Sequence, residues 1–149
     1  KGAFVKSWEK EEVLEVLVIR EVLEGLAAKL ACGHRTPDFI LRLETYLKNQ
    51  KDKISSYQET DEQFHSDIIQ TSKSKRLIDL IQSTHDNLEM MDMREVSFKS
   101  PERIKESMKE HHRIIDAFKA GDSEKVEFCV RDHFRIIRSF YQAQLELTK

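Results

Sequence analysis

Three histidines and one aspartate occupy positions where the helical pattern predicts buried apolar residues. His111 and His133 each interrupt a row of apolar residues, while Asp61 and His65 lie one turn apart on a face shared with Phe64. Separate burial of four polar groups would cost free energy at each one, so a shared partner is the simplest explanation. Imidazole nitrogens with a carboxylate oxygen suit zinc, nickel, copper or ferrous iron better than calcium or magnesium.

The same residues could instead be hydrogen-bonded histidines of the core. An acid four residues from a histidine is a weak signal in a chain with 6 His and 27 acidic residues. His85 with Glu89 and His112 with Asp116 show the same spacing, and we interpret both as surface pairs. The metal hypothesis therefore depends on the convergence of three separate stripes, and the core alternative stays open on this evidence.

Helices must position these side chains, because the sequence pattern is that of an all-α chain. Apolar periodicity with start and stop signals predicts an antiparallel bundle of six helices, or seven, around a central cavity. The predicted spans are close to 9–32, 36–53, 57–71, 74–96, 100–120 and 122–145. Thr36 and Ser100 each precede a proline, the order expected of an N-cap and a first helical residue.

The last two predicted helices should bring two of the histidines together. Gly121 supplies a left-handed stop, and Asp122 can cap the helix that follows. His111 and His133 each lie 11 positions from Asp122. In an antiparallel hairpin both would sit at one level, roughly 16 Å from the turn at about 1.5 Å per residue.

The composition fits one helical domain and argues against DNA binding by this segment. The chain has 149 residues, 35% of them charged and 39% hydrophobic, with 4 Gly and 2 Pro. A formal net charge of -2 provides no basic field for a phosphate backbone. Two cysteines make no disulfide framework, and no signal peptide or membrane-length apolar run is visible. We therefore expect a cytoplasmic protein with no membrane partner.

Three segments give the chain a specific resemblance to a known family. At "DEQFHSDI", "EHHRIIDAFKAGD" and "VRDH" it resembles the FCD domain, the C-terminal effector-binding domain of GntR-type transcription regulators of the FadR subfamily. In that family one aspartate and three histidines ligate a metal, which implies Asp61, His65, His111 and His133 as the ligands here. The family's offsets begin at His111, so His112 is not expected to be a ligand.

The resemblance implies a regulator and not an enzyme. It implies that residues 1–7 are a remnant of the wing and linker of a preceding winged helix-turn-helix domain, and that residues 8–149 form the all-helical FCD domain. DNA would be bound only through that N-terminal domain, by a homodimer. The implied cofactor is a divalent transition metal, with zinc as the first expectation and nickel, iron or manganese as alternatives.

The effector that the resemblance implies is a small organic acid, a carboxylate bound in the cavity at open positions of the metal. The candidate effector-binding residues are Arg20, Ser74 and His85. Arg20 could point inward and pair with a second carboxylate of the effector, or form an ion pair with Glu24. Ser74 stands where the family often has asparagine. Two other functions remain: a metal-dependent enzyme that activates water, and a metal sensor or structural metal-binding bundle.

Overall fold

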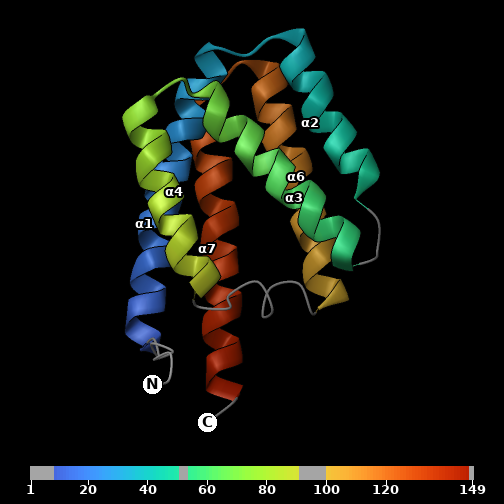
Figure 1. Ribbon diagram of the computed structural model, residues 1–149. Helices are drawn as coiled ribbons and strands as arrows, with labels where there is room; N and C mark the ends of the chain where they lie inside the picture. The colour runs from blue at the N-terminus through green and yellow to red at the C-terminus, as the bar shows by residue number, and fades with distance from the viewer. Residues whose placement is uncertain (1–8, 51–53, 91–99, 148–149) are drawn as a thin grey trace, which may run out of the picture.

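In the computed structural model, which describes residues 9–50, 54–90 and 100–147, six helices follow one another with alternating direction (Figure 1). They are α1 (Lys10–Gly33), α2 (Pro37–Asn49), α3 (Ile54–Thr71), α4 (Lys75–Met90), α6 (Pro101–Ala120) and α7 (Ser123–Leu147). No strand occurs among the described residues. The prediction of an all-α antiparallel bundle is confirmed.

Local signals start and stop several helices as predicted. The Thr36 side chain accepts a hydrogen bond from the Phe39 amide, and the hydroxyl of Ser100 caps α6 in the same way. Gly121 has φ 69°, a left-handed conformation that glycine adopts without steric cost, and it ends α6. The Asp122 carboxylate accepts a hydrogen bond from the Lys125 amide at the start of α7.

Several predicted boundaries were wrong by a few residues. The second helix ends at Asn49 and not near 53, because Gln50 already has an extended backbone. The third begins at Ile54, about one turn earlier than predicted, and α7 continues to Leu147. Helix α1 includes Gly33, which was expected to follow it. The predicted continuation of the fourth helix to 96 lies outside the described residues, as do residues 1–7.

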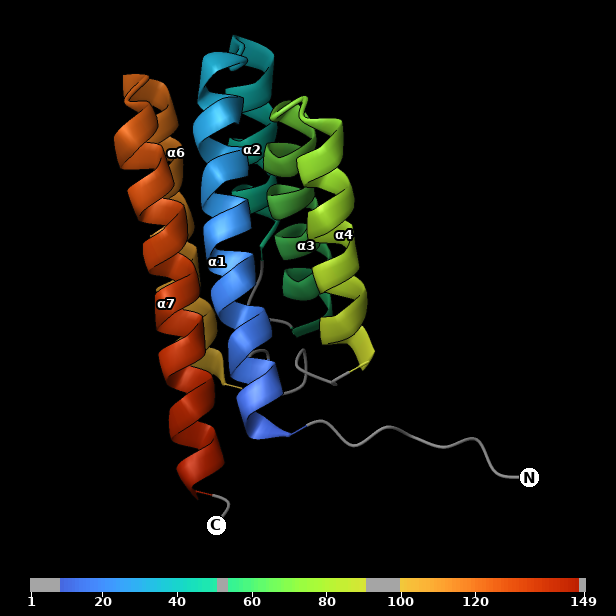
Figure 2. The ribbon, with the colours of Figure 1, turned by 90° about the vertical axis from the view of Figure 1, so that its left-hand side faces the viewer.

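Helix α1 packs most extensively against α7 and also contacts α3 and α4, while α2 contacts α3 and α6. Figure 2 shows α1 between α7 on one side and α4 on the other. The main core cluster lies among α1, α2, α3, α6 and α7, where the rings of Phe39 and Phe118 meet edge to face at 5.1 Å. Among the described residues, no helix has the length and apolar character needed to cross a membrane.

Candidate metal centre

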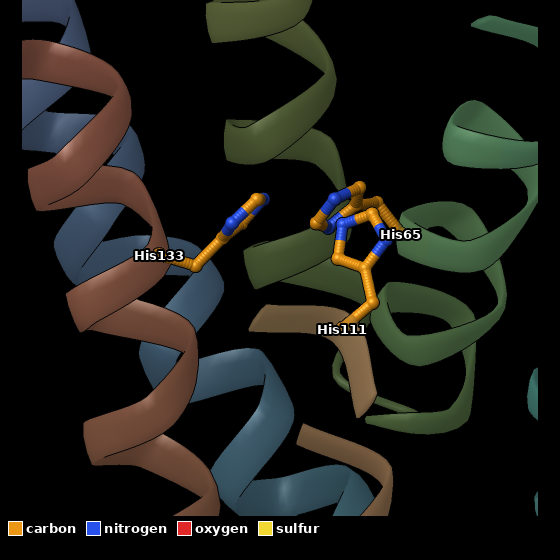
Figure 3. A group of neighbouring side chains, drawn as sticks. All are labelled: His65, His111 and His133. Carbon is orange, nitrogen blue, oxygen red and sulfur yellow. The ribbon is translucent and has the colours of Figure 1, made fainter. Parts of the chain in front are cut away.

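Three imidazoles from three different helices meet inside the bundle. His65 comes from α3, His111 from α6 and His133 from α7, and their rings point toward one another (Figure 3). One ring nitrogen of each lies within 4.8 Å of those of the other two. All three are buried, with exposed fractions of 5%, 0% and 1%. The convergence of three polar interruptions, on which the metal hypothesis depended, is present in the structure.

The helical hairpin explains how two of these residues meet. The left-handed turn at Gly121 reverses the chain, and the ring centroids of His111 and His133 lie 4.8 Å apart. The prediction that both sit at one level of the hairpin is confirmed. Helix α3 then places His65 5.1 Å from the ring of His111 and 5.2 Å from that of His133. The Phe64 ring stacks on the His111 ring with 4.4 Å between the ring centroids.

Asp61 lies beside the imidazoles, one helical turn before His65. Its Oδ1 is 3.4 Å from Nε2 of His65 and 3.3 Å from Nε2 of His111. The carboxylate is 16% exposed and borders the cavity described below. A single oxygen close to two ring nitrogens is suitably placed to share an ion with them, so the geometry is compatible with Asp61 as a fourth ligand.

Each imidazole has a different partner on its Nδ1 side. Nδ1 of His133 lies 2.7 Å from Oε1 of Glu110, and Nδ1 of His111 lies 3.4 Å from the side-chain amide of Gln50. Nδ1 of His65 is 3.8 Å from Oε1 of Glu24. The carboxylate oxygen beside Nδ1 of His133 favours the tautomer with the proton there, which leaves Nε2 as the lone-pair nitrogen. At His111 the neighbouring atom is the amide nitrogen of Gln50, and rotation of that amide would instead bring its oxygen, which has no partner among the described residues, to Nδ1.

Two ring nitrogens of the cluster lack a hydrogen-bond partner within the described part of the chain, as nitrogens that bind a metal would. Nε2 of His111 and Nε2 of His133 are buried and have no hydrogen-bond partner among the described residues. Buried polar atoms of this kind are rare because each lacks the interaction it had with water. A divalent ion between them would satisfy both, so the residues present fit a metal.

The protonation states also suit a metal. Burial, reinforced by His133, lowers the pKa of His111 well below its usual value, and burial lowers that of His133 despite the opposing Glu110 carboxylate. Burial would raise the pKa of Asp61, but the nearby imidazoles, His65 first, hold it well below its ordinary value. His111 and His133 are therefore favoured as neutral imidazoles and Asp61 as an ionised carboxylate, the forms that bind metal ions.

The cluster forms part of the wall of a cavity of about 300 Å³ between α1, α3, α4, α6 and α7. Asp61, His65 and His133 line it, so an ion at the cluster would be reachable from the cavity. Arg20 and His85, two of the candidate effector-binding residues, line it as well. Ser74 is not among the lining residues, and its backbone amide donates to the hydroxyl of Ser72.

Arg20 forms an ion pair with Glu24, one of the two alternatives for this residue, and it also borders the cavity. Its Nε donates to Oε2 of Glu24, which is 2% exposed, and the guanidinium also lies over the Phe134 ring at 4.7 Å. Burial would raise the pKa of Glu24, but Arg20 and the neighbouring histidines bring it to about 2. Arg20 is thus already paired with an internal carboxylate.

His85 is half-buried and borders the cavity, with Nε2 3.6 Å from Oε2 of Glu24. The surface pair with Glu89 that the spacing suggested involves a side chain outside the described residues. His112, by contrast, is exposed as expected.

Three residues beside the cluster were not anticipated from the sequence. Arg103 donates through both terminal nitrogens to the two oxygens of Glu110, at 2.9 and 2.5 Å, and Glu110 in turn contacts His133. The sequence feature that could have predicted this ion pair is the separation of seven residues between Arg103 and Glu110, which places them two turns apart on one face of the helix. Gln50, at the end of α2, gave no signal at all.

A helical bundle with buried imidazoles on the wall of an internal cavity has the form of a ligand-binding domain. The model of the FCD domain family matches residues 15–136, well over half of the chain. The chain belongs to this family and is the FCD domain of a GntR-family regulator.

Solved structures agree on the fold. The chain is similar to E. coli McbR/YncC, with a TM-score of 0.77 and 22% sequence identity, over 91% of this chain and 67% of that one. At this identity the likeness shows the fold alone. No curated protein is significantly similar to the chain.

Proposed function

We propose that this chain is the sensor domain of a transcription regulator that binds a small carboxylate effector through a protein-bound divalent metal. The observation that carries the proposal is the buried cluster of three imidazoles. Two of them have a ring nitrogen without a hydrogen-bond partner among the described residues, and two line a cavity. The ligands would be Asp61, His65, His111 and His133. Zinc is the first expectation for such nitrogen and oxygen donors, and nickel, iron and manganese are alternatives.

Binding of the effector would be transmitted to the DNA-binding domain through a change in the position of α1. Arg20 of this helix borders the cavity and Glu24 lies close to His65, and α1 is the first of the described helices. A winged helix-turn-helix domain ahead of α1 would bind the DNA, in the cytoplasm. Differential binding of the effector to two positions of α1 would then change how the DNA-binding domains are held.

Turnover of the bound acid is not part of the proposal. FCD domains are typically non-enzymatic. Among the described residues that line the cavity, Arg20 is paired with Glu24, Arg103 with Glu110, and His85 faces Glu24. The two arginines are therefore engaged, whereas Nε2 of His85 has no hydrogen-bond partner among the described residues, so the fate of a bound acid is checked directly in the test that follows.

Organic acids should stabilise the zinc-loaded protein against heat much more than the zinc-free protein. An acid at a hundredfold its Kd adds about 2.7 kcal/mol, which for a domain of this size raises the Tm by roughly 5 to 10 °C. Thermal unfolding with hexanoate, succinate and citrate, with and without zinc, measures this, and NMR of the acid after incubation checks that it is unchanged. Equal stabilisation without zinc would contradict metal docking, and consumption of the acid would indicate an enzyme.

A homodimer is the assembly we propose, with α1 at the interface. Five apolar residues between 40% and 49% exposed follow one side of this helix: Val18, Ile19, Val22, Leu26 and Leu30. A contiguous apolar stripe of this kind marks an interaction surface. Figure 2 is a view onto the side of the molecule where α1 is not covered by another helix.

The double substitution Val22→Glu with Leu26→Glu is expected to convert a dimer into a monomer, because two pairs of like charges would face each other across the two-fold axis. Sedimentation velocity at micromolar concentration measures the mass. Leu41→Glu on α2, where the side chain is 58% exposed outside this stripe, is the matched control. Dimers of the double variant, or a monomeric parent, would show that α1 is not the interface.

A further inference from the structure

Both polar and apolar side chains line the cavity. Asp61, His65 and His133 contribute polar groups, as do Gln70 and Gln82, and the rest of the wall is largely apolar. The apolar wall is contributed by Leu17, Ile69, Ile78, Ile81, Phe134 and Ile137. A molecule that fills the cavity with a polar group at the histidines must therefore also cover this apolar surface.

Both arginines on the cavity wall already have a buried counter-charge. Arg20 is paired with Glu24, and Arg103 uses both terminal nitrogens on the carboxylate of Glu110. Glu24 and Glu110 are 2% and 5% exposed, so water screens these pairs weakly. No lysine is among the described residues that line the cavity.

With a divalent metal bound, the formal charges around the site leave one positive charge that is not balanced. Arg20, Arg103 and a divalent ion together contribute four positive charges, and Glu24, Glu110 and Asp61 contribute three negative ones. Glu62 also borders the cavity, but it is exposed to solvent, where its charge is screened. The excess is one positive charge, located at the metal.

We infer that the effector is a monocarboxylic acid with an apolar body, bound with its carboxylate at the metal and its hydrocarbon part against the isoleucine-rich wall. This rests on the proposed function above. A second carboxylate on the same molecule would be buried where both arginines of the described lining are already paired, which is unfavourable. The carboxylate of Glu24 is the specificity-determining group, because its ion pair with Arg20 keeps that guanidinium from pairing with a second carboxylate of the effector.

Three probes of equal length separate these contributions: hexanoate, its dicarboxylate analogue adipate, and the neutral hexanamide. Calorimetric titration of the zinc-loaded protein should give a Kd for hexanoate at least about tenfold lower than for either of the others, since each lacks one favourable feature. Tighter binding of adipate or hexanamide would overturn the inference and leave metal docking intact. Binding of no acid, or binding that is the same without zinc, would overturn the proposed function as well.

The Glu24→Gln variant tests the specificity residue directly. Glutamine keeps the shape of the side chain and removes its charge, so Arg20 becomes available to a second carboxylate. The ratio of adipate to hexanoate affinity should rise by about tenfold or more, while Glu15→Gln, an exposed position on the same helix, should leave it unchanged. An unchanged ratio in folded Glu24→Gln protein would show that Glu24 does not set the preference. If that variant does not fold, the order of affinities for hexanoate, adipate and hexanamide in the parent protein tests the inference.

Discussion

Replacement of His111 or His133 by alanine is expected to lower zinc affinity by well over a hundredfold. Each would supply a ligand nitrogen, since its Nε2 is buried and has no hydrogen-bond partner among the described residues. Loss of a ligand should cost more affinity than the roughly 10- to 100-fold typical of a change to a residue that only supports a ligand. Elemental analysis after dialysis should give near-stoichiometric metal in the parent and little in either variant. His112→Ala, at an exposed neighbouring position, should retain the metal.

The folded state of each variant must be checked, because His111 and His133 are almost fully buried and alanine leaves a cavity. Circular dichroism and thermal unfolding serve for this, and His111→Gln provides a variant with a larger side chain. A parent that takes up no metal after reconstitution with zinc or nickel would contradict the metal hypothesis. The imidazoles would then be polar core residues or direct contacts of an organic ligand.

Substitution of Glu110 by glutamine is expected to weaken zinc binding by about 10- to 100-fold, although Glu110 is not a proposed ligand. Its carboxylate lies 2.7 Å from Nδ1 of His133, so it fixes the ring's tautomer and increases the electron density on Nε2. A chelator competition titration measures the loss. ¹⁵N chemical shifts of the His133 ring report the tautomer, which a purely structural role for Glu110 would not change.

The same substitution leaves Arg103 buried without its partner, which alone would destabilise the fold. The double variant Arg103→Met with Glu110→Gln removes both charges and separates the two effects. Zinc affinity should stay low in the double variant if the contact with His133 is responsible. Glu106→Gln, an exposed position on α6, should bind zinc as the parent does, and recovery of affinity in the double variant would contradict the role of Glu110.

The sequence was informative about the cluster because the causes are local. A histidine within an apolar row must be buried with its helix face, and a glycine turn midway between two such rows brings them to the same level. These two facts predicted the meeting of His111 and His133, and the Asp61–His65 spacing added the third helix. The predicted ends of the helices were less accurate than their centres. At Gln50, for example, no sequence feature marks the change to extended backbone.

The sequence by itself thus determined the all-α class, the caps, the hairpin and the burial of three imidazoles, all of which follow from periodicity and turn chemistry within single segments. Only the tertiary structure decided the electrostatics of the site. The carboxylates of Glu24 and Glu110 lie against histidines of other helices, and Arg20 has two chemically reasonable partners whose choice depends on burial. Charge pairing falls steeply with distance and rises with burial, and both quantities are set by helix packing, which no single segment specifies.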